Sequence, residues 1–529
     1  MPTLEWIGKE KVINHHQEVP FRVLERRYSF DENGQMDADN GSENMVIRGD
    51  NLEALKALLP RYEGRVKCIY IDPPYNTGNE GWVYNDNVND PKIKKWLGEV
   101  VGKEGEDLSR HDKWLCMMYP RLKLLQRLLH PTDGSIFISI DENEMANLKL
   151  VCNEIFGSNR HVATITWQKR YSRENRGAIG DAHEYILVYA SDVENFKAIR
   201  HRVEFDEKSA KIYKNPNNDP KGRWRAVPMT AQGYRPNQMY PITTPSGKIC
   251  YPPQGRCWST VESEYKKLLA TGRIYFGKNG DSQPSIIRYL SEVEGMVPWT
   301  WWPHEEVGHT DEAKKQIISI LGDADSFDTP KPTRLLERIF QIASDPDSII
   351  LDSFAGSGTT AHAVLNMNKA DGGNRKFILV EMMDYADSIT AERAKRVIQG
   401  YGEGKNAVEG TGGSFSFYDL GQPLLIDENL NEEVAAEKIR EYIWFMETKV
   451  PYAPPAGENA YYLGSHNHTA YYFYYEPQRI TVLDYAFLAT LTQKADGTVI
   501  YADRCAIGEE KLAQMGIVFK KIPRDITRL

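Results

Sequence analysis

The stretch SIILDSFAGSGTTAHAVL, residues 348–365, has the pattern of a buried strand, a tight glycine turn and a helix. Gly356 and Gly358 allow the backbone to turn sharply and to approach a ligand closely. The next apolar run, KFILVE at 376–381, ends in Glu381. An acidic residue at that place binds the ribose hydroxyls in dinucleotide-type folds. The segment therefore predicts an α/β sheet with a nucleoside site at the ends of its strands.

The glycine turn also narrows the choice of ligand. It has no third glycine in the G-x-G-x-x-G spacing and no lysine after the glycines, so NAD and ATP fit it poorly. A nucleoside without phosphates fits better. A turn of this kind can also serve chain geometry alone, and the loop by itself does not separate these two interpretations.

Toward the N-terminus, strands and helices continue to alternate. The runs MVIRGD (45–50) and VKCIYID (66–72) are short and apolar, and the leucines of NLEALKALLPRY (51–62) between them follow helical spacing. This strand–helix–strand order favours a parallel sheet. The same patterns predict further strands at 134–141, 161–167 and 183–190, and further helices at 114–129, 145–156, 331–343 and 389–399.

Asp72-Pro73-Pro74-Tyr75 follows directly after the second of these strands. Consecutive prolines fix φ and lack N–H donors, so their carbonyls and the adjacent carboxylate form a rigid set of acceptors. Such a set suits a planar amine with two hydrogens to donate, and the tyrosine can stack on an aromatic base. A strand that ends at a proline turn is the simpler alternative, but it explains neither the tyrosine nor the glycine loop.

The composition is that of a globular protein of several domains. Of the 529 residues, 41% are hydrophobic and 26% are charged, with a net charge of −9. No apolar run approaches the roughly 20 residues of a membrane span, and the first residues lack a secretory signal. The six cysteines contain no C-x-x-C pair, which argues against a disulfide framework and a zinc site. We therefore expect a cytoplasmic protein that does not bind a membrane.

DPPYNTG (72–78) together with FAGSG (354–358) resembles the amino-methyltransferases of DNA. The catalytic run precedes the glycine loop, as in their β class, which is circularly permuted and carries its target-recognition domain between the two halves. DPPYNTG, HEYILVY (183–189) and KKIPRDI (520–526) are similar to the Mod subunits of type III restriction–modification systems. The resemblance covers most of residues 45–400.

The resemblance implies an α/β fold: the Rossmann-like sheet of methyltransferases that use S-adenosylmethionine (SAM), circularly permuted, with an inserted target-recognition domain and a small C-terminal domain. The expected divisions are a loosely structured lead-in at 1–44, a catalytic half at 45–190, the target-recognition insert at 191–325, a SAM-binding half at 326–419, and a C-terminal dimer or partner interface at 420–529.

The resemblance also implies roles for individual residues. Asp72, Pro73, Pro74 and Tyr75 would act on the target amine. SAM would be bound by residues of the segments 49–55 and 327–339, the glycine loop and the following strand. These residues are Asp50, Lys331, Pro332, Thr333, Asp352, Phe354, Ala355, Gly356, Ser357, Gly358, Thr359 and Glu381. No metal is needed for this chemistry.

The implied function is site-specific methylation of N6 of a flipped adenine in double-stranded DNA, in a restriction–modification or phage-defence system. Asp at the first position of the catalytic run favours adenine over cytosine. Implied partners are a second copy of the chain and a restriction subunit with helicase and nuclease activities, in the nucleoid of a bacterium or archaeon. The alternatives are an N4-cytosine or RNA amino-methyltransferase, and a DNA-binding relative without turnover.

Basic residues gather in one part of this acidic chain. Residues 159–225 hold 14 Lys and Arg against nine Asp and Glu. Basic segments that carry aromatic residues suit contact with phosphates and bases, although a solvated face is the simpler interpretation. The candidates for DNA contact are Lys169, Arg170, Arg173, Arg176 and Arg225. We interpret His183 and Glu184, by contrast, as a pair that fixes a loop at the start of a strand.

Overall fold

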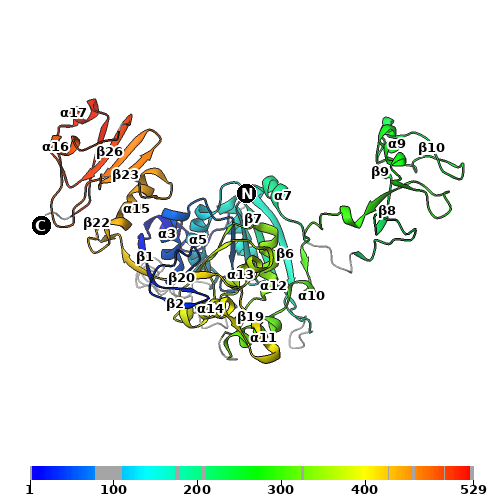
Figure 1. The fold of residues 1–529 in the computed structure, drawn as a ribbon, viewed down its shortest axis with the longest axis horizontal. Coiled ribbons are helices and arrows are strands. Elements are labelled where there is room, and N and C mark those ends of the chain that lie inside the picture. The colour runs from blue at the N-terminus through cyan, green and yellow to red at the C-terminus, as the bar shows by residue number, and fades with distance from the viewer. Residues whose placement is uncertain are drawn as a thin grey trace. The chain divides into compact units, whose positions relative to one another are not determined.

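The computed structural model describes residues 3–77, 110–172, 179–203, 210–322, 327–426, 428–455, 459–493 and 495–524. It divides into two compact units, each considered by itself (Figure 1). The first comprises Met1–His201 and Trp299–Leu529, and the second is Arg202–Pro298. None of the helices in the described ranges has the length and apolar character needed to cross a membrane.

The first unit is built on a mixed sheet of 11 strands. In spatial order these are β15 (Trp301–Trp302), β6 (His161–Gln168), β7 (His183–Ala190), β5 (Ser135–Ile140), β4 (Cys68–Ile71), β16 (Ile349–Asp352), β17 (Lys376–Glu381), β3 (Met45–Arg48), β20 (Ser414–Pro423), β1 (Arg22–Asp31) and β2 (Gly34–Met36).

The strands from β5 to β20 run parallel to one another, as the sequence predicted for most of them. β7 is antiparallel to both of its neighbours, β5 and β6. Only residues 169–182 join β6 to β7, with no crossover helix among those described. Parallel neighbours are usually joined through a helix, so a connection without one is typical of an antiparallel pair.

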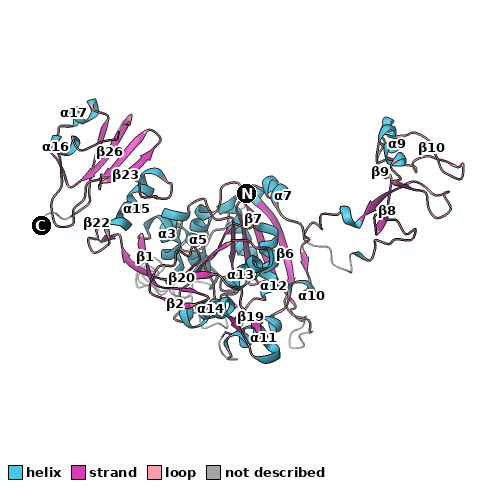
Figure 2. Cartoon of the chain, viewed as in Figure 1, coloured by secondary structure: helices cyan, strands magenta, loops and turns pink. Residues whose placement is uncertain are grey.

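Two groups of helices accompany the central strands (Figure 2). The first group is α3 (Asn51–Tyr62), α5 (Arg110–Leu128) and α6 (Met145–Cys152); the second is α12 (Thr333–Ala343), α13 (Thr359–Asp371) and α14 (Glu392–Gln399). Every residue of β4 and β5 is buried, which shows that both faces of the central sheet are covered.

The topology places the predicted motifs at one edge of the sheet. β4 and β16 are parallel neighbours, but the chain leaves β4 toward β5 on one side and leaves β16 toward β17 on the other. The crevice at such a reversal, beyond the carboxyl ends of the strands, is the usual ligand site of open α/β sheets. Asp72 follows β4 and the glycine loop follows β16, so both motifs lie at the carboxyl ends of these two neighbouring strands.

The N-terminal residues differ from the loose lead-in that we expected. β1 pairs with β20 along most of its length, and Trp6, Val12 and Val19 are buried in the main core. Two short helices, α1 (Lys9–Val12) and α2 (His15–Glu18), precede β1. The polar run at 31–44 obscured this order, because the pairing that stabilises β1 comes from a strand almost 400 residues further along the chain.

The C-terminal residues contain α15 (Ala436–Thr448) and a sheet of β23 (Tyr462–His466), β24 (Thr469–Phe473), β26 (Gly497–Ala502) and β28 (Ile517–Lys521). The tyrosine-dense run AYYFYYEP, residues 470–477, contributes its first four residues to β24. Tyr471 and Phe473 pack into the core beside α15, whereas Tyr472 packs on the opposite face of the sheet. Shorter elements are β25 (Val482–Leu483), α16 (Tyr485–Leu488), β27 (Arg504–Cys505) and α17 (Glu509–Gln514).

The second unit is narrower than the insert expected at 191–325. It holds a sheet of β13 (Ile274–Tyr275), β14 (Ser285–Tyr289) and β8 (Trp224–Pro228), two short strand pairs and α9 (Glu262–Ala270). α7 (Val193–Ile199), α10 (His304–Val307) and α11 (Thr310–Leu321) belong to the first unit. α10 packs on α12 and α11 on α14, which explains why they stay with the main sheet.

Candidate functional site

The catalytic run and the segment before α12 meet through Asp72. Its Oδ1 lies 2.9 Å from the Tyr75 hydroxyl, and its Oδ2 accepts a hydrogen bond of 2.8 Å from Lys331 Nζ. The two charged residues are 259 positions apart in the chain. The structure thus joins a residue predicted to act on the target amine to one predicted to bind the cofactor.

Glu184 belongs to the same cluster. It lies on β7 with 8% of its surface exposed, and its Oε2 is 3.0 Å from the Tyr75 hydroxyl and 3.6 Å from Lys331 Nζ. Its Oε1 lies 3.4 Å from Lys169 Nζ. We interpreted Glu184 as part of a loop-fixing pair, so the sequence analysis missed it. Its position after His183 at the start of an apolar strand was the available signal.

The cluster keeps its tyrosine neutral and its lysine charged. Burial and the nearby carboxylates of Asp72 and Glu184 raise the pKa of Tyr75 well above its usual value. Burial opposes the charge on Lys331, but the attraction of the same two carboxylates outweighs it and raises the lysine pKa. Nζ of Lys331 also lies 4.9 Å from the centre of the Tyr75 ring, a cation–π distance.

The carbonyls of Pro73 and Pro74 differ in their hydrogen bonding. The Pro74 carbonyl accepts a 2.7 Å hydrogen bond from Trp114 Nε1. Among the residues that the structure describes, none donates to the Pro73 carbonyl. Asn76 follows with a positive φ of 59°, and its side-chain amide donates to Glu144. The run is therefore fixed at Pro74 and at Asn76, the residue directly after it.

Trp114→Phe is expected to lower the rate of the methyl transfer that the sequence resemblance implies by about tenfold, because the Pro74 carbonyl loses a buried partner and the loop loses its fixed geometry. Steady-state kinetics would measure the loss of rate, and thermal unfolding would measure any accompanying loss of stability. Trp444→Phe is the matched control, since Trp444 Nε1 also donates to a proline carbonyl, that of Pro451, at 3.1 Å. Equal losses of rate in the two variants would contradict the role given to Trp114.

The glycine loop is shaped by two carboxylates. Asp352 accepts from the Phe354 N–H at 3.0 Å and from the Thr360 hydroxyl at 2.6 Å, and burial raises its pKa to about 7. Glu381 accepts from the N–H of Gly356 at 2.8 Å and from that of Met383 at 3.0 Å. Asp352 therefore positions the loop, and Glu381 sits beside it at the end of β17.

Asp50 caps α3 by accepting from the N–H groups of Leu52 and Glu53 at 2.9 and 3.2 Å. Its other oxygen accepts from Arg121 at 3.1 Å. The neighbouring Asn51 donates to the carbonyl of Ser353 at 3.1 Å. The turn after β3 is thus joined to the turn after β16.

Arg393 is a further residue that the sequence analysis missed. It is fully buried, and it donates to the hydroxyls of Ser357 at 3.0 Å, Thr359 at 2.8 Å and Thr333 at 3.3 Å. Burial lowers its pKa to about 9. Arg393 thereby connects the glycine loop to the start of α12, where Pro332 is the N-cap residue. Phe354 and Ala355 are buried in the same loop.

The predicted DNA contacts separate into different surroundings. Lys169 pairs with Asp181 at 2.8 Å as well as with Glu184, so it belongs to the cluster around Asp72. Arg170 is exposed. Arg225 lies in the second unit, 5.3 Å from the ring centre of Tyr213. Arg173 and Arg176 lie outside the described residues.

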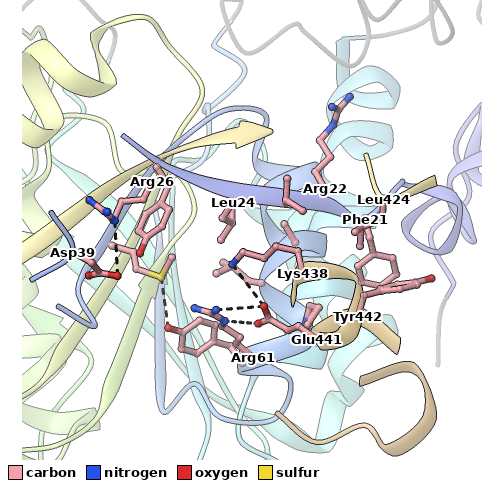
Figure 3. Close-up of a pocket in the computed structure, with 17 residues that line it drawn as sticks. Phe21, Arg22, Leu24, Arg26, Asp39, Arg61, Leu424, Lys438, Glu441 and Tyr442 are labelled. Atoms are coloured by element: carbon pink, nitrogen blue, oxygen red, sulfur yellow. Dashed lines mark hydrogen bonds and ion pairs between the residues drawn. The ribbon is translucent and has the colours of Figure 1, made fainter. Parts of the chain in front are cut away.

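A cavity of about 250 Å³ lies elsewhere in the first unit, between β1, α3 and α15 (Figure 3). In it Arg61 and Lys438 point toward Glu441 and pair with it. None of its lining residues is a predicted site residue. The described residues contain no group of three or more His, Cys, Asp or Glu placed to bind a metal ion.

Comparison with known proteins identifies the class. The N6/N4 methyltransferase family model, described as DNA methylase, matches residues 66–392. The chain therefore belongs to this family of DNA methylases.

Within the family, the chain is similar to the Mod subunit of the type III restriction–modification enzyme StyLTI of Salmonella typhimurium. The two are 40% identical over 369 residues, which cover 66% of this chain and 54% of the relative. It is also similar to the type II methyltransferase M.KpnI of Klebsiella pneumoniae, with 30% identity over 67% of this chain and 84% of the relative.

The matches with Mod subunits span between about half and two thirds of those proteins; for EcoPI Mod of phage P1 the share is 63%, at 33% identity over 72% of this chain. Among solved structures, the cytosine-N4-specific PvuII DNA methyltransferase matches 66% of this chain and 86% of its own, with 12% identity and a TM-score of 0.35.

Proposed function

We propose that the protein is a site-specific DNA methyltransferase that transfers a methyl group from SAM to N6 of an adenine flipped out of the duplex. The observation that carries this proposal is the cluster of Asp72, Tyr75, Glu184 and Lys331, which lies at the same edge of the sheet as the glycine loop. An acceptor carboxylate, a stacking ring and a nucleoside loop at one sheet edge fit amine methylation better than any other chemistry that we considered.

The chain's own groups orient the amine. A base inside a duplex must be extruded to reach a catalytic pocket, and Tyr75 offers its ring for stacking. Asp72 and the Pro73 carbonyl accept the two amine hydrogens, which directs the nitrogen lone pair away from the ring system. Holding two reactants in a fixed orientation lowers the activation barrier, by up to about 7–11 kcal/mol in well-oriented systems.

SAM, when bound, supplies a methyl group on a sulfonium centre. The residues present fit it: Glu381 ends β17 beside the glycine loop and accepts from the Gly356 N–H, and an acidic residue at this place suits the ribose hydroxyls. Gly356, Ser357, Gly358 and Thr359 would hold the nucleoside part of SAM. Lys331, Pro332 and Thr333 would hold its methionine part, and Asp50 would bind its adenine.

The sheet order supports the finer fold assignment to a circularly permuted, Rossmann-like methyltransferase. The strand that carries the catalytic run, β4, precedes β16 in the chain but lies beside it in space. Similarity to Mod subunits supports a role in restriction–modification, in the cytoplasm of a bacterium or archaeon. A second copy of the chain, docked through residues 420–529, and a restriction subunit are the partners that we infer for this role.

The second unit supplies the basic surface that DNA binding requires. Residues 202–298 contain 15 Lys and Arg against nine Asp and Glu, a net charge of +6, so the other residues together carry −15. Arg225 on β8 and Arg288 on β14 are direct cross-strand partners. Like charges directly opposite each other are destabilising in a sheet, and a bound phosphate would compensate for them.

Arg225→Ala and Arg288→Ala are each expected to weaken binding to duplex DNA. The slope of log affinity against log salt should also fall by about one for each phosphate contact that is lost. Fluorescence anisotropy at several salt concentrations measures both quantities. Arg273→Ala is the matched control, because Arg273 is already neutralised by Glu292 at 2.7 Å. An unchanged salt slope in both test variants would remove these two residues from the DNA interface.

Methylation-aware sequencing of DNA treated with the protein and SAM tests the function itself. Modified adenine at one recurrent sequence is the expected result. N4-methylcytosine, or transfer of label to RNA alone, would favour the other amino-methyltransferases. SAM binding without any transfer would favour a DNA-binding relative without turnover.

A further inference from the structure

Both groups that contact Asp72 have a second acceptor within reach. The Tyr75 hydroxyl is 2.9 Å from Asp72 Oδ1 and 3.0 Å from Glu184 Oε2. Nζ of Lys331 is 2.8 Å from Asp72 Oδ2 and 3.6 Å from the same oxygen of Glu184. The two carboxylates come from different strands, and they face the same two donors.

This arrangement limits how Asp72 can receive an amine. Each of its oxygens already lies against a donor, and the ammonium of Lys331 is one of them. A buried cation that loses its anion is strongly disfavoured. Asp72 keeps further acceptor positions, but it becomes a stronger acceptor for a substrate amine when Lys331 and the Tyr75 hydroxyl hydrogen bond to another acceptor.

We propose that Glu184 is that acceptor: it takes Lys331 and the Tyr75 hydroxyl from Asp72 when the target amine enters, and so leaves Asp72 to the amine. This inference rests on the proposed amine methylation. Glu184 does not touch the amine, so it is a positioning residue. No proton is transferred in the exchange, because Tyr75 and Lys331 are hydrogen-bond donors both before and after it.

The surroundings of Glu184 suit this role. Its Oε1 faces Lys169 at 3.4 Å, and Lys169 is itself paired with Asp181 at 2.8 Å. Oε2 is therefore the oxygen turned to Tyr75 and Lys331. With only 8% of Glu184 exposed, water competes little for this oxygen, and a charge-assisted hydrogen bond there is stronger than at the surface.

Glu184→Gln tests the exchange, since glutamine keeps the size and a carbonyl acceptor for Tyr75 but loses the charge that attracts Lys331. We expect the single-turnover methylation rate to fall by about 10- to 100-fold, the range for a lost hydrogen bond to a charged group. Affinity for S-adenosylhomocysteine and for duplex DNA should be unchanged. A wild-type rate, or a matching loss of both affinities, would overturn the proposal.

Glu447→Gln is the matched control. Glu447 on α15 also accepts from a tyrosine, Tyr501, and from a lysine, Lys520, but it is not part of the cluster. It should keep the wild-type rate. A rate loss there equal to that of Glu184→Gln would mean that the loss of any such carboxylate slows the enzyme, and it would overturn the specific role.

A double mutant distinguishes a positioning role of Glu184 from general damage to the site. In Lys331→Met no cation remains to be transferred, and two carboxylates are left facing each other. Adding Glu184→Gln removes one of them, so the double variant should be at least as fast as Lys331→Met alone, whereas damage at independent sites adds up. A double variant slower than both single variants contradicts the exchange. If the wild-type protein methylates no DNA at all, the proposed function fails instead.

Discussion

Asp72→Ala is expected to reduce methyl transfer by about 100- to 1,000-fold, the scale seen when a preorganised partner of the reacting group is removed from an active site. Asp72 is the acceptor that orients the amine, and no other described carboxylate lies against both Tyr75 and Lys331 except Glu184. Single-turnover transfer of labelled methyl groups to duplex DNA would measure the loss.

The same substitution should leave binding of S-adenosylhomocysteine intact. Lys331 keeps Glu184 as an anionic neighbour at 3.6 Å, so the buried cation is not left uncompensated and the fold should persist. Isothermal titration with S-adenosylhomocysteine tests this point. Asp72→Asn, which keeps the side-chain size, should behave in the same way. Retained turnover in Asp72→Ala would exclude Asp72 as the acceptor, whereas asparagine still offers a carbonyl oxygen.

Asp345→Ala is the control for Asp72→Ala. Asp345 pairs with Lys67 at 3.2 Å and with His201 at 3.0 Å, at the amino ends of β16 and β4, the opposite edge of the same two strands. It should show wild-type turnover. If only Asp72→Ala loses turnover, the loss is due to the place of Asp72 at the site and not to the removal of an Asp–Lys ion pair as such.

Most of the central sheet could be predicted because its signals are local. The apolar runs that became β3, β4, β16 and β17 are short, bounded and separated by helical spacing, and each predicted strand appears in the structure within a few residues. The glycine loop and the catalytic run are likewise contiguous motifs. Their meeting followed from one topological rule, that the carboxyl ends of parallel strands lie at one edge.

The remainder depended on contacts between distant residues. Glu184 and Arg393 stand in ordinary-looking segments, and only their tertiary partners, such as Tyr75 and Thr359, mark them as parts of the site. We predicted Lys169 as a DNA contact because a sequence shows which residues are charged but not which residues they pair with. In the structure Lys169 forms ion pairs with Asp181 and Glu184. β1 was not predicted for the same reason, since its pairing with β20 is also a contact between distant parts of the chain.

Gly358→Ala is expected to weaken binding of S-adenosylhomocysteine by more than about tenfold and to lower the melting temperature. Gly358 has a φ of +76°, and a Cβ there would lie 2.7 Å from the carbonyl oxygen of Thr390. Thr390 cannot retreat easily, because its hydroxyl donates to the Gly356 carbonyl at 2.6 Å. The alanine would therefore displace the loop itself.

Gly372→Ala measures the part of this effect that is due to backbone conformation alone. Gly372 ends the same helix, α13, with a φ of +71°, but no atom lies within 4 Å of the place its Cβ would take. It should lose about 1 kcal/mol of stability, the cost of a left-handed alanine, and keep full affinity. If both variants bind S-adenosylhomocysteine equally well, the loop after β16 does not form the nucleoside site, and the cofactor must bind elsewhere in the crevice.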